Sequence, residues 1–428
     1  MTYGESVGGG GRGGDRISQA VITGFGAITP AGNDRETTWR NLVAGNSAVA
    51  PITAFDASDL AVRIAGEVRD FDPGRVIDRR QLRRTARFSQ FAIVAAHEAV
   101  ADAGLVIDEG SAGRVGVVIN AAVAGFDTVE AATRQIAGTG AGPLSPYFVA
   151  SSLANMPACE VAIGLGVHGP VLASALACAS GISALVQARQ LILAGEADAV
   201  VCGGTDAGIT PVMFAGLIPT GALSRRNDDP AGASRPFDAD RDGFVYGEGA
   251  VVAVVESEEH AARRGATRYA VLAGGALTAD AFHVSAPLPD GRYAAEAIRL
   301  ALRRSGLDPA DLDYVCAHAT GTKAGDVAET RAIRQALGPA ADSVAVSSPK
   351  SMTGHLIGAA GALGAMACAL AIRDGIVPPT INLKTPDPEC DLDCVPNVAR
   401  PLQVRAAITN AFGFGGQNCV AVLTAPER

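Results

Sequence analysis

One cysteine and two histidines lie in segments whose residues fit a reactive site. Cys178 stands between an apolar, strand-like stretch and a long helical one. His318 and His355 each follow a strand-like run and a few small or hydroxyl-bearing residues. A thiolate is a strong nucleophile, and a neutral imidazole can donate a hydrogen bond to a developing enolate or oxyanion. A nucleophile with two such imidazoles suits carbon–carbon bond formation from thioesters better than it suits proteolysis.

Helix starts are predicted beside two of these residues. A helix over 182–194 begins just after Cys178. Its unpaired amides and positive dipole end are expected to lower the pKa of the thiol. His355 opens another predicted helix, which disfavours the charged imidazolium. From its own segment alone, Cys178 is equally well an ordinary buried core cysteine, and it is the histidines that favour a reactive one.

Lys350 precedes His355 by five residues and can orient a carboxylate or a water network there. Glu329 and Asp326 are the candidate carboxylate partners, because both lie in the segment that follows His318. These three residues are therefore expected to support the two histidines.

The composition bounds the class of protein. The 428 residues suggest two or three domain-sized units, and 48% of them are hydrophobic and 18% charged, where about 25% charged is usual. A large core and a large subunit interface follow. The net charge of −9 argues against nucleic-acid binding. The eight cysteines predict reduced thiols in a cytoplasmic protein, and Cys390 and Cys394 lack a second ligand pair, so no metal site is expected.

Two segments bear on targeting and membranes. Residues 1–17 are Gly-rich and polar and are expected to form a disordered tail without a signal peptide. Residues 356–372 carry no charge, but this length is at the lower edge of the ~17–25 residues that span a bilayer. Gly358, Gly361 and Gly364 recur at every third position, which favours a buried helix packed on another backbone and no membrane contact.

Short apolar runs alternate with longer segments of helical period, which predicts a layered α/β fold. The predicted strands cover 20–23, 115–119, 199–202, 250–256, 269–273, 314–317, 344–346 and 419–423, and the predicted helices 37–44, 90–103, 182–194, 294–305 and 328–337. Two halves repeat one plan, 18–265 with Cys178 and 266–428 with both histidines. In each half a strand leads to a reactive residue and then to a helix. The halves are expected to share one core, since no long linker separates them.

The chain resembles a known family over nearly its whole length, from about Val21 to Leu423. Beside the segments of Cys178, His318 and His355, the resemblance rests on Gly24–Pro30 (GFGAITP), on Phe237-Asp238 with Arg241–Phe244 (RDGF), on Gly247–Gly249 (GEG) and on Asn410–Asn418 (NAFGFGGQN). These segments resemble the elongating β-ketoacyl-acyl carrier protein synthases of type II, in the thiolase superfamily. The resemblance implies a thiolase fold, a five-layer αβαβα sandwich of two similar halves, in a dimer.

The same resemblance implies the reaction and its groups. Cys178 takes the acyl chain as a thioester, and His318 and His355 bind the malonyl thioester carbonyl and stabilise the enolate left by decarboxylation. Backbone amides of Cys178 and Phe414 form the oxyanion hole, and Phe414 is also the gate of the acyl pocket. Val123 limits that pocket at the dimer interface. The product is a β-ketoacyl chain on the carrier.

The resemblance implies roles for further residues of this chain. Thr320 and Thr322 resemble the hydroxyls that bind pantetheine amides. Lys350 and Glu329 resemble an ion pair that supports the histidines. The substrates are carried on the phosphopantetheine of acyl carrier protein, so no separate cofactor is implied.

A basic run lies in this acidic chain, made up of Arg75, Arg79, Arg80, Arg83, Arg84 and Arg87. One interpretation is a solvated helix face. The other is docking of an acidic acyl carrier protein, since complementary charge speeds encounter. Arg80, Arg83 and Arg84 match the family's docking residues.

Three other classes of the superfamily are disfavoured. Thiolases place a second cysteine in the final glycine-rich loop, which here reads Gly413–Gly416 (GFGG). Initiating synthases use Asn where His355 stands, and non-catalytic chain-length-factor subunits lack the cysteine that is present here as Cys178. Gly221, Ala319 and Gln417 depart from housekeeping fatty-acid enzymes. They leave open the ketosynthase of a type II polyketide or polyene system, as a homodimer or as a heterodimer with a chain-length-factor-like subunit. A Cys–His hydrolase is a further rival.

Overall fold

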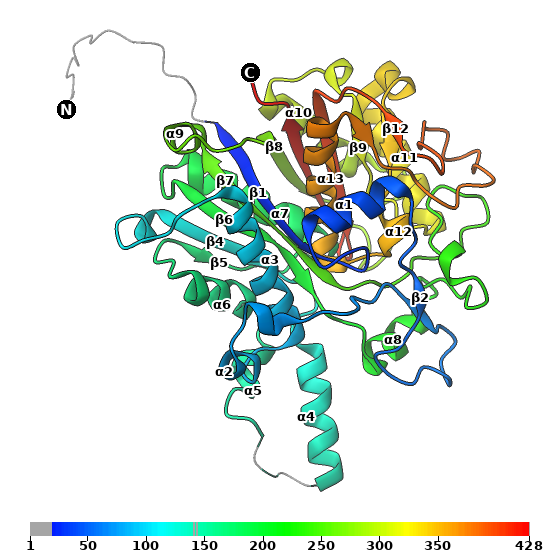
Figure 1. Cartoon of the computed structure of the whole chain (residues 1–428). Coiled ribbons are helices and arrows are strands. Elements are labelled where there is room, and N and C mark those ends of the chain that lie inside the picture. The colour runs from blue at the N-terminus through cyan, green and yellow to red at the C-terminus, as the bar shows by residue number, and fades with distance from the viewer. Residues whose placement is uncertain (1–18, 140–141, 143, 428) are drawn as a thin grey trace, which may run out of the picture.

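Ten strands form one continuous sheet in the computed structural model, which describes residues 19–139, 142 and 144–427. The order is β10-β9-β13-β14-β8-β1-β7-β6-β4-β5 (Figure 1). The centre of this sheet is weakly joined, because β1 and β8 pair through only two residue pairs, Val21 with Val271 and Ile22 with Ala270. The predicted tail, residues 1–17, lies outside the described residues.

The two sides of that junction have the same topology. The first half contributes β1 (Ala20–Ile28), β4 (Val115–Asn120), β5 (Val171–Leu172), β6 (Ala199–Asp206) and β7 (Gly249–Ser257). The second contributes β8 (Ala270–Ala279), β9 (Tyr314–Cys316), β10 (Ala345–Ser347), β13 (Ala406–Gly413) and β14 (Gln417–Thr424). In each half, the five strands can be numbered in chain order and followed from the outer edge of the sheet to the junction. Their order in space is then third, second, fourth, fifth and first in both halves. The parallel and antiparallel pairings are also the same in both halves. The two similar halves predicted from the sequence are thereby confirmed.

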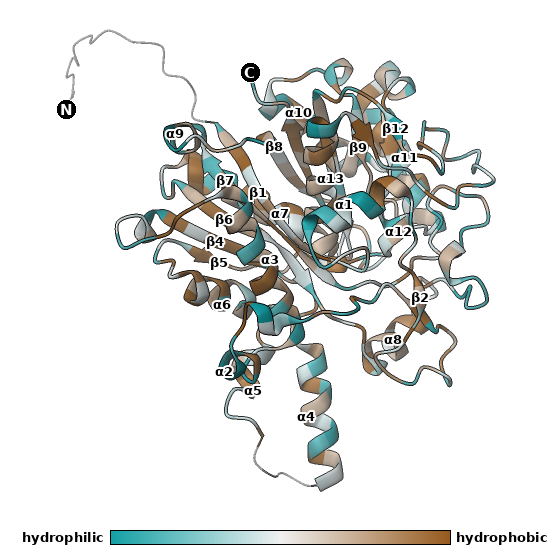
Figure 2. Ribbon diagram, in the orientation of Figure 1, coloured by the Kyte–Doolittle hydropathy of each residue, from teal (hydrophilic) through white to brown (hydrophobic). Residues whose placement is uncertain are grey.

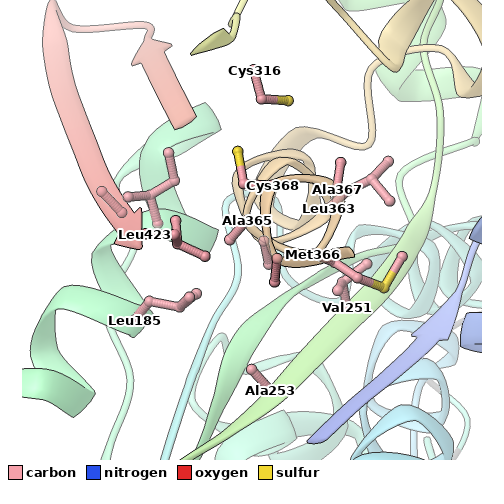
Figure 3. Close-up of a cluster of buried hydrophobic side chains, with 14 of the residues drawn as sticks. Leu185, Val251, Ala253, Cys316, Leu363, Ala365, Met366, Ala367, Cys368 and Leu423 are labelled. Carbon is pink, nitrogen blue, oxygen red and sulfur yellow. The ribbon is translucent and has the colours of Figure 1, made fainter. Parts of the chain in front are cut away.

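Helices complete the five layers. α3 (Arg87–Ala103) and α6 (Met156–Leu165) pack on the outer face of the first sheet. α10 (Arg292–Ser305) and α11 (Lys323–Leu337) pack on that of the second. α7 (Ser180–Leu193) and α13 (Ala360–Asp374) share one core with strands of both halves, part of which Figure 3 shows. The arrangement is the predicted αβαβα sandwich.

Small residues let the two central helices approach each other. A Cβ added at Gly181 would lie 2.6 Å from the Ala362 nitrogen, and one at Gly361 would lie 2.7 Å from Ile182 Cγ1. Ile357–Asp374 is long and apolar enough to cross a membrane, but 89% of it is buried inside the fold. Figure 2 shows α13 within the molecule, and the predicted buried helix is confirmed.

The remaining described elements are short or peripheral. They are α1 (Arg35–Ala44), α2 (Arg79–Leu82), α4 (Phe126–Thr139), α5 (Phe148–Ser152), α8 (Pro211–Leu217), α9 (Glu258–Arg263), α12 (Lys350–Thr353) and the strands β2 (Ala50–Pro51), β3 (Ile64–Ala65), β11 (Ile376–Val377) and β12 (Arg400–Pro401). The predicted segments missed the helix α4 and, in the large sheet, the strands β5 and β13. α4 extends away from the body of the molecule (Figure 1), and β13 carries polar residues at 409 and 410 that hide its strand pattern.

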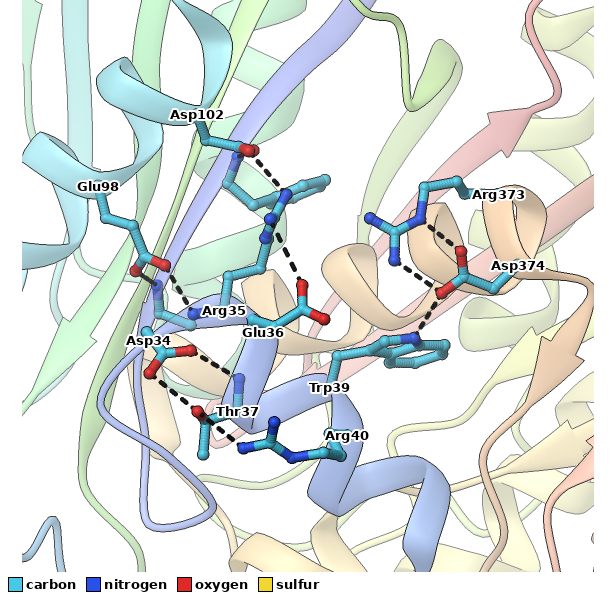
Figure 4. Close-up of polar contacts among 12 residues, drawn as sticks. Asp34, Arg35, Glu36, Thr37, Trp39, Arg40, Glu98, Asp102, Arg373 and Asp374 are labelled. Atoms are coloured by element: carbon cyan, nitrogen blue, oxygen red, sulfur yellow. Dashed lines mark hydrogen bonds and ion pairs between the residues drawn. The ribbon is translucent and has the colours of Figure 1, made fainter.

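A polar network ties the first helix to both halves (Figure 4). Arg35 of α1 pairs with Asp102 of α3 (2.7 Å) and also bonds the hydroxyl of Tyr269, just before β8. Trp39 of α1 donates from Nε1 to Asp374 at the end of α13 (2.7 Å). α1 therefore links the two halves close to their weak strand junction, since Tyr269 directly precedes Ala270 of that junction.

Candidate active site

Cys178 lies in the turn Ala177–Ala179 (η3), directly before the buried helix α7. Its side chain is 9% exposed. Ala177 has a φ of 45°, in the left-handed region that non-glycine residues avoid. Such backbone strain persists only where the surrounding packing holds it, and here it directs the residue that follows it.

The structure brings the three predicted reactive residues together. His318 follows β9, and His355 follows α12. The Cys178 sulfur and one ring nitrogen of each histidine all lie within 4.8 Å of one another. The two imidazoles stand edge to face, with ring centroids 5.3 Å apart. One thiol therefore faces two imidazoles that come from the other half of the chain.

Both histidines are neutral. Burial lowers the pKa of His318 and of His355 well below the usual value, and the Lys350 cation lowers both further. The Nδ1 atom of His355 accepts a hydrogen bond from the Ile357 amide (3.2 Å), so the ring proton is on Nε2. Within the described residues, that Nε2 has no hydrogen-bond partner. The predicted neutral state is confirmed, with burial rather than a helix end as its main cause.

The predicted direction of the Cys178 pKa is wrong. Burial raises the pKa of this thiol to about 11, and the Phe414 amide and the Lys350 cation lower it only in part. The loss of water disfavours every charged form in this site, the thiolate as much as the imidazolium. Cys178 is therefore a thiol rather than a thiolate at neutral pH.

Phe414 lies beside the nucleophile at the end of β13. Its backbone amide lies close enough to the Cys178 thiol to lower the pKa of that thiol, and its side chain is 41% exposed. Gly413 before it fits tightly, because a Cβ there would lie 3.1 Å from the Cys178 nitrogen. The Phe414 ring thus stands at the surface while its amide points to the sulfur.

The carboxylates near Lys350 have other partners than the sequence suggested. Glu329 accepts from the amides of His318 (2.8 Å) and Ala319 (2.6 Å) and from Asn410 Nδ2 (3.0 Å). Lys350 donates to the Ala317 carbonyl (3.4 Å), and no direct Lys350–Glu329 ion pair forms within the described chain. The expected ion pair between Lys350 and Glu329 is therefore wrong, because the Glu329 carboxylate already accepts hydrogen bonds from two backbone amides.

Asp326 likewise does not pair with Lys350. It accepts from the amides of Phe237 (2.9 Å) and Gly321 (3.1 Å), and Arg241 Nε lies 3.4 Å from it. Arg241 in turn pairs with Asp387 (2.6 Å). Asp326 therefore fixes the loop after His318 rather than the lysine.

Thr320 and Thr322 lie in that loop with their hydroxyls 3.2 Å apart. Thr320 is buried and Thr322 half-buried, so the pair sits where the loop begins to meet solvent. The two hydroxyls are adjacent, as binding of one extended ligand by both would require.

Sequence analysis missed Asp206. It ends β6, is fully buried, and accepts from the amides of Ala122 (3.1 Å), Val123 (2.9 Å) and Gly358 (2.7 Å). Burial raises its pKa to about 6. An acid at the end of an otherwise apolar strand was the available signal. Through it, the Val123 segment and the turn before α13 are held together.

Val123 packs against a separate apolar cluster. That cluster contains Phe214, Tyr246 and Ile357, and Val123 is half-buried at its edge. A cavity of about 540 Å³ elsewhere in the described part of the chain is lined by Arg87, Asp127, Glu248 and neighbouring residues, and by neither Cys178 nor the two histidines.

Only part of the arginine run is open to a partner. Arg80 and Arg83 are exposed on and after α2. Arg84 is paired with Glu160 (3.1 Å), and Arg87 with the buried Glu248 (2.8 Å). Arg84 is consequently less suited to docking than the sequence suggested.

The Cys178, His318 and His355 atoms are also a donor set that zinc accepts, three soft or borderline ligands within one coordination sphere. The same set serves acyl transfer, in which a thiol is acylated and two imidazoles stabilise negative oxygen. Two comparisons distinguish these uses.

The first comparison is with protein families. Residues 18–261 match the model of the β-ketoacyl synthase N-terminal domain, and residues 269–384 match that of the C-terminal domain. A condensing acyltransferase is the class that this fold and site define. The chain belongs to the β-ketoacyl synthase family.

Individual relatives cover nearly the whole chain. The 3-oxoacyl-[acyl-carrier-protein] synthase 2 of Synechocystis sp. is 49% identical over 94% of this chain and 96% of its own. That of Staphylococcus aureus is 46% identical over 94% and 97%. Among solved structures, the ishigamide ketosynthase/chain length factor has a TM-score of 0.90 at 37% identity, covering 96% of this chain and 100% of that one. A type II polyketide synthase ketosynthase in complex with its acyl-carrier protein has a TM-score of 0.88 at 32% identity, with the same coverage.

Proposed function

We propose that this chain elongates acyl chains by decarboxylative Claisen condensation on acyl carrier protein. The observation that carries the proposal is the meeting of the Cys178 sulfur with two neutral imidazoles within 4.8 Å. Cys178 displaces the carrier thiol from an acyl thioester and holds the acyl group. Malonyl-carrier then loses CO₂, and the electron pair of the broken bond moves into the enolate.

The two histidines stabilise that enolate. The Nε2–H of His355 is a free donor whose tautomer the Ile357 amide fixes. His318 lies across from it and completes the donor pair. Donors preorganised in a water-poor site act where charge develops, and one such donor contributes about 3 kcal/mol. Burial and Lys350 keep the rings neutral, so they donate hydrogen bonds without protonating the enolate carbon.

Bond formation follows at Cys178. The enolate carbon attacks the acyl thioester, and the tetrahedral oxyanion is stabilised by the amides of Cys178 and Phe414. Collapse expels the Cys178 thiolate, which regains a proton, and releases β-ketoacyl-carrier. The Phe414 ring serves as the gate, Thr320 and Thr322 bind the pantetheine arm, and Lys350, Glu329 and Asp326 support the histidines. No further cofactor or metal is needed for these steps.

The pathway is fatty acid or type II polyketide elongation. The 46–49% identity to two bacterial 3-oxoacyl-[acyl-carrier-protein] synthases supports the first. The 37% identity to the ishigamide ketosynthase/chain length factor supports the second, as do Gly221, Ala319 and Gln417. We propose that the enzyme works in the cytoplasm. The bounds proposed for its two halves are 18–265 and 266–428.

A second subunit is part of the proposal, either another copy or a chain-length-factor-like protein. Large apolar side chains are exposed around α4, α5, α6 and β5, namely Phe126, Val129, Ile136, Val149, Ile163, Val171 and Leu172. An exposed apolar surface beside an unpaired strand edge is typical of a subunit interface. Val123 would then limit the acyl pocket near this interface, and Val123→Ile should shorten the longest chain accepted.

Carrier docking is assigned to the exposed arginines. Arg80→Glu with Arg83→Glu should raise the KM for acyl-carrier about tenfold and leave that for a small pantetheine thioester unchanged, because only the carrier meets the patch. Arg303→Glu, on the exposed face of α10, is the matched control. Equal effects on both substrates would assign α2 a structural role.

Mass spectrometry of carrier-bound products tests the whole proposal. Purified chain with malonyl-carrier and an acyl-carrier should give the β-ketoacyl-carrier, longer by one two-carbon unit. Product only after a chain-length-factor-like subunit is added would indicate the heterodimer. Release of free acid would identify a hydrolase, and no acylation of Cys178 would identify a non-catalytic subunit.

A further inference from the structure

A small cavity lies beside Lys350, among buried residues of β9, β13 and α13. Its volume is about 10 Å³, close to the space of one water molecule. Polar and apolar residues line it, namely Cys316, Ala317, Pro349, Lys350, Ala360, Leu363, Gly364, Thr409 and Asn410. A buried water persists where two to four polar groups surround it.

Three polar groups on this wall are short of partners. Lys350 can donate three hydrogen bonds, and within the described chain it donates one, to the Ala317 carbonyl at 3.4 Å. Asn410 donates from Nδ2 to Glu329, which as a carboxylate can only accept, and its buried Oδ1 is left without a protein partner. Thr409 is 1% exposed and turns its hydroxyl toward the cavity wall at Gly364.

Glycine at 364 keeps this space open. A Cβ there would lie 2.3 Å from the Thr409 hydroxyl and 3.3 Å from the Cys316 sulfur. The cavity therefore exists because position 364 has no side chain. It lies among the Lys350 ammonium, which donates hydrogen bonds, the Asn410 amide oxygen, which accepts them, and the Thr409 hydroxyl, which can donate and accept.

We propose that this cavity holds one ordered water that joins Lys350 to Asn410 and, through Asn410, to Glu329 and the His318 backbone. The link takes the place of the direct Lys350–Glu329 ion pair that the structure lacks. A cation is disfavoured, because the charged group on the cavity wall is the Lys350 ammonium itself. Thr409 and Asn410 are then positioning residues that act on the histidines through Lys350 and Glu329. The catalytic consequence rests on the proposed function, whereas the water site itself does not.

A crystal structure of the full chain tests the site directly. Density for one water is expected within hydrogen-bond distance, about 2.7–3.2 Å, of Lys350 Nζ, Thr409 Oγ1 and Asn410 Oδ1. Crystals soaked in rubidium chloride should give no anomalous peak there. An empty cavity in a map that resolves other buried waters, or an anomalous peak, would overturn the proposal even if the enzyme proved inactive.

Variants at Thr409 test the consequence. Thr409→Val removes the hydroxyl and keeps the shape, so decarboxylation of malonyl-carrier should fall about tenfold, as for loss of one hydrogen bond in a charged network. Acylation of Cys178 should change less than twofold. Thr409→Ser restores the hydroxyl and should restore the rate. Cys419→Ala, in the buried neighbouring strand β14, controls for core packing. A valine variant that keeps both its water and its full decarboxylation rate would refute the link.

Discussion

The turns before the two central helices are built alike and used differently. η3 (Ala177–Ala179) precedes α7, and η8 (Ile357–Ala359) precedes α13. Each turn opens with a residue in the left-handed region, Ala177 at φ 45° and Ile357 at φ 51°. The middle residue is the nucleophile Cys178 in the first turn and Gly358 in the second. The same backbone turn thus positions the proposed nucleophile in the first half, whereas in the second half it donates a hydrogen bond to the buried Asp206.

Neighbouring side chains account for this difference. At Gly358 a Cβ would lie 2.4 Å from the Asp206 carboxylate, which accepts the Gly358 amide at 2.7 Å. At Cys178 the corresponding space faces His318 and His355. The fold therefore supplies two equivalent helix starts, and the side chains that surround each one decide which can hold a nucleophile.

The largest expected effect comes from removing the nucleophile at the first turn. Cys178→Ser should reduce condensation by at least about a hundredfold, since a hydroxyl is a far weaker acid and a far weaker nucleophile than a thiol in the same place. The measurement is β-ketoacyl-carrier formation, with Cys159→Ser, in half-exposed α6, as the control. A serine variant with more than a tenth of the parent rate would exclude Cys178 as the nucleophile.

Removing either imidazole should separate the two half-reactions. His318→Ala and His355→Ala should each lower malonyl decarboxylation about a hundredfold while Cys178 still accepts an acyl group, because the rings act on the enolate. The assays are CO₂ release and intact-protein mass. His97→Ala, in α3 outside the site, is the matched variant. Normal decarboxylation by a variant would remove that histidine from the proposed mechanism.

The pH dependence of Cys178 alkylation measures whether burial or the helix start controls the thiol. Burial raises the pKa to about 11, so the thiolate fraction, and with it the rate, should rise about tenfold for each pH unit between 7 and 9. Iodoacetamide labelling of the Cys178 peptide, followed by mass spectrometry, gives the rate. If the helix start controlled the thiol, the rate would level off near neutral pH.

The smallest effect is expected at the second turn. Gly358→Ala should lower the free energy of unfolding by about 1–3 kcal/mol, because its Cβ has no space beside Asp206. Gly216→Ala, in α8 with no atom within 4 Å of the added Cβ, should be neutral or slightly stabilising. Urea denaturation of both variants measures the difference. Equal stabilities would mean that the second turn tolerates a side chain and that the comparison of the two turns fails.

Much of the fold could be predicted from local pattern. The cores of eight strands and five helices, among them β4, β7, α3 and α10, match predicted segments, because apolar periodicity and glycine after helix ends are local signals. β13 was missed, since Thr409 and Asn410 interrupt its apolar run, whereas α4 was missed although its apolar residues recur at helical spacing. The repeat of the two halves was visible only as a shared order of strand, reactive residue and helix.

The sequence by itself determined which residues we propose for the chemistry, since Cys178, His318, His355 and Lys350 each lie in a recognisable local segment. Only the tertiary structure decided how they are charged and held. Packing of both halves removes water from the site, so the cysteine stays protonated and the histidines stay neutral. The partners of Glu329, Asp326 and Asp206 could not be predicted either, because each of these carboxylates binds a group from a distant segment, namely Asn410, Phe237 and Gly358. The sequence contains no record of such contacts.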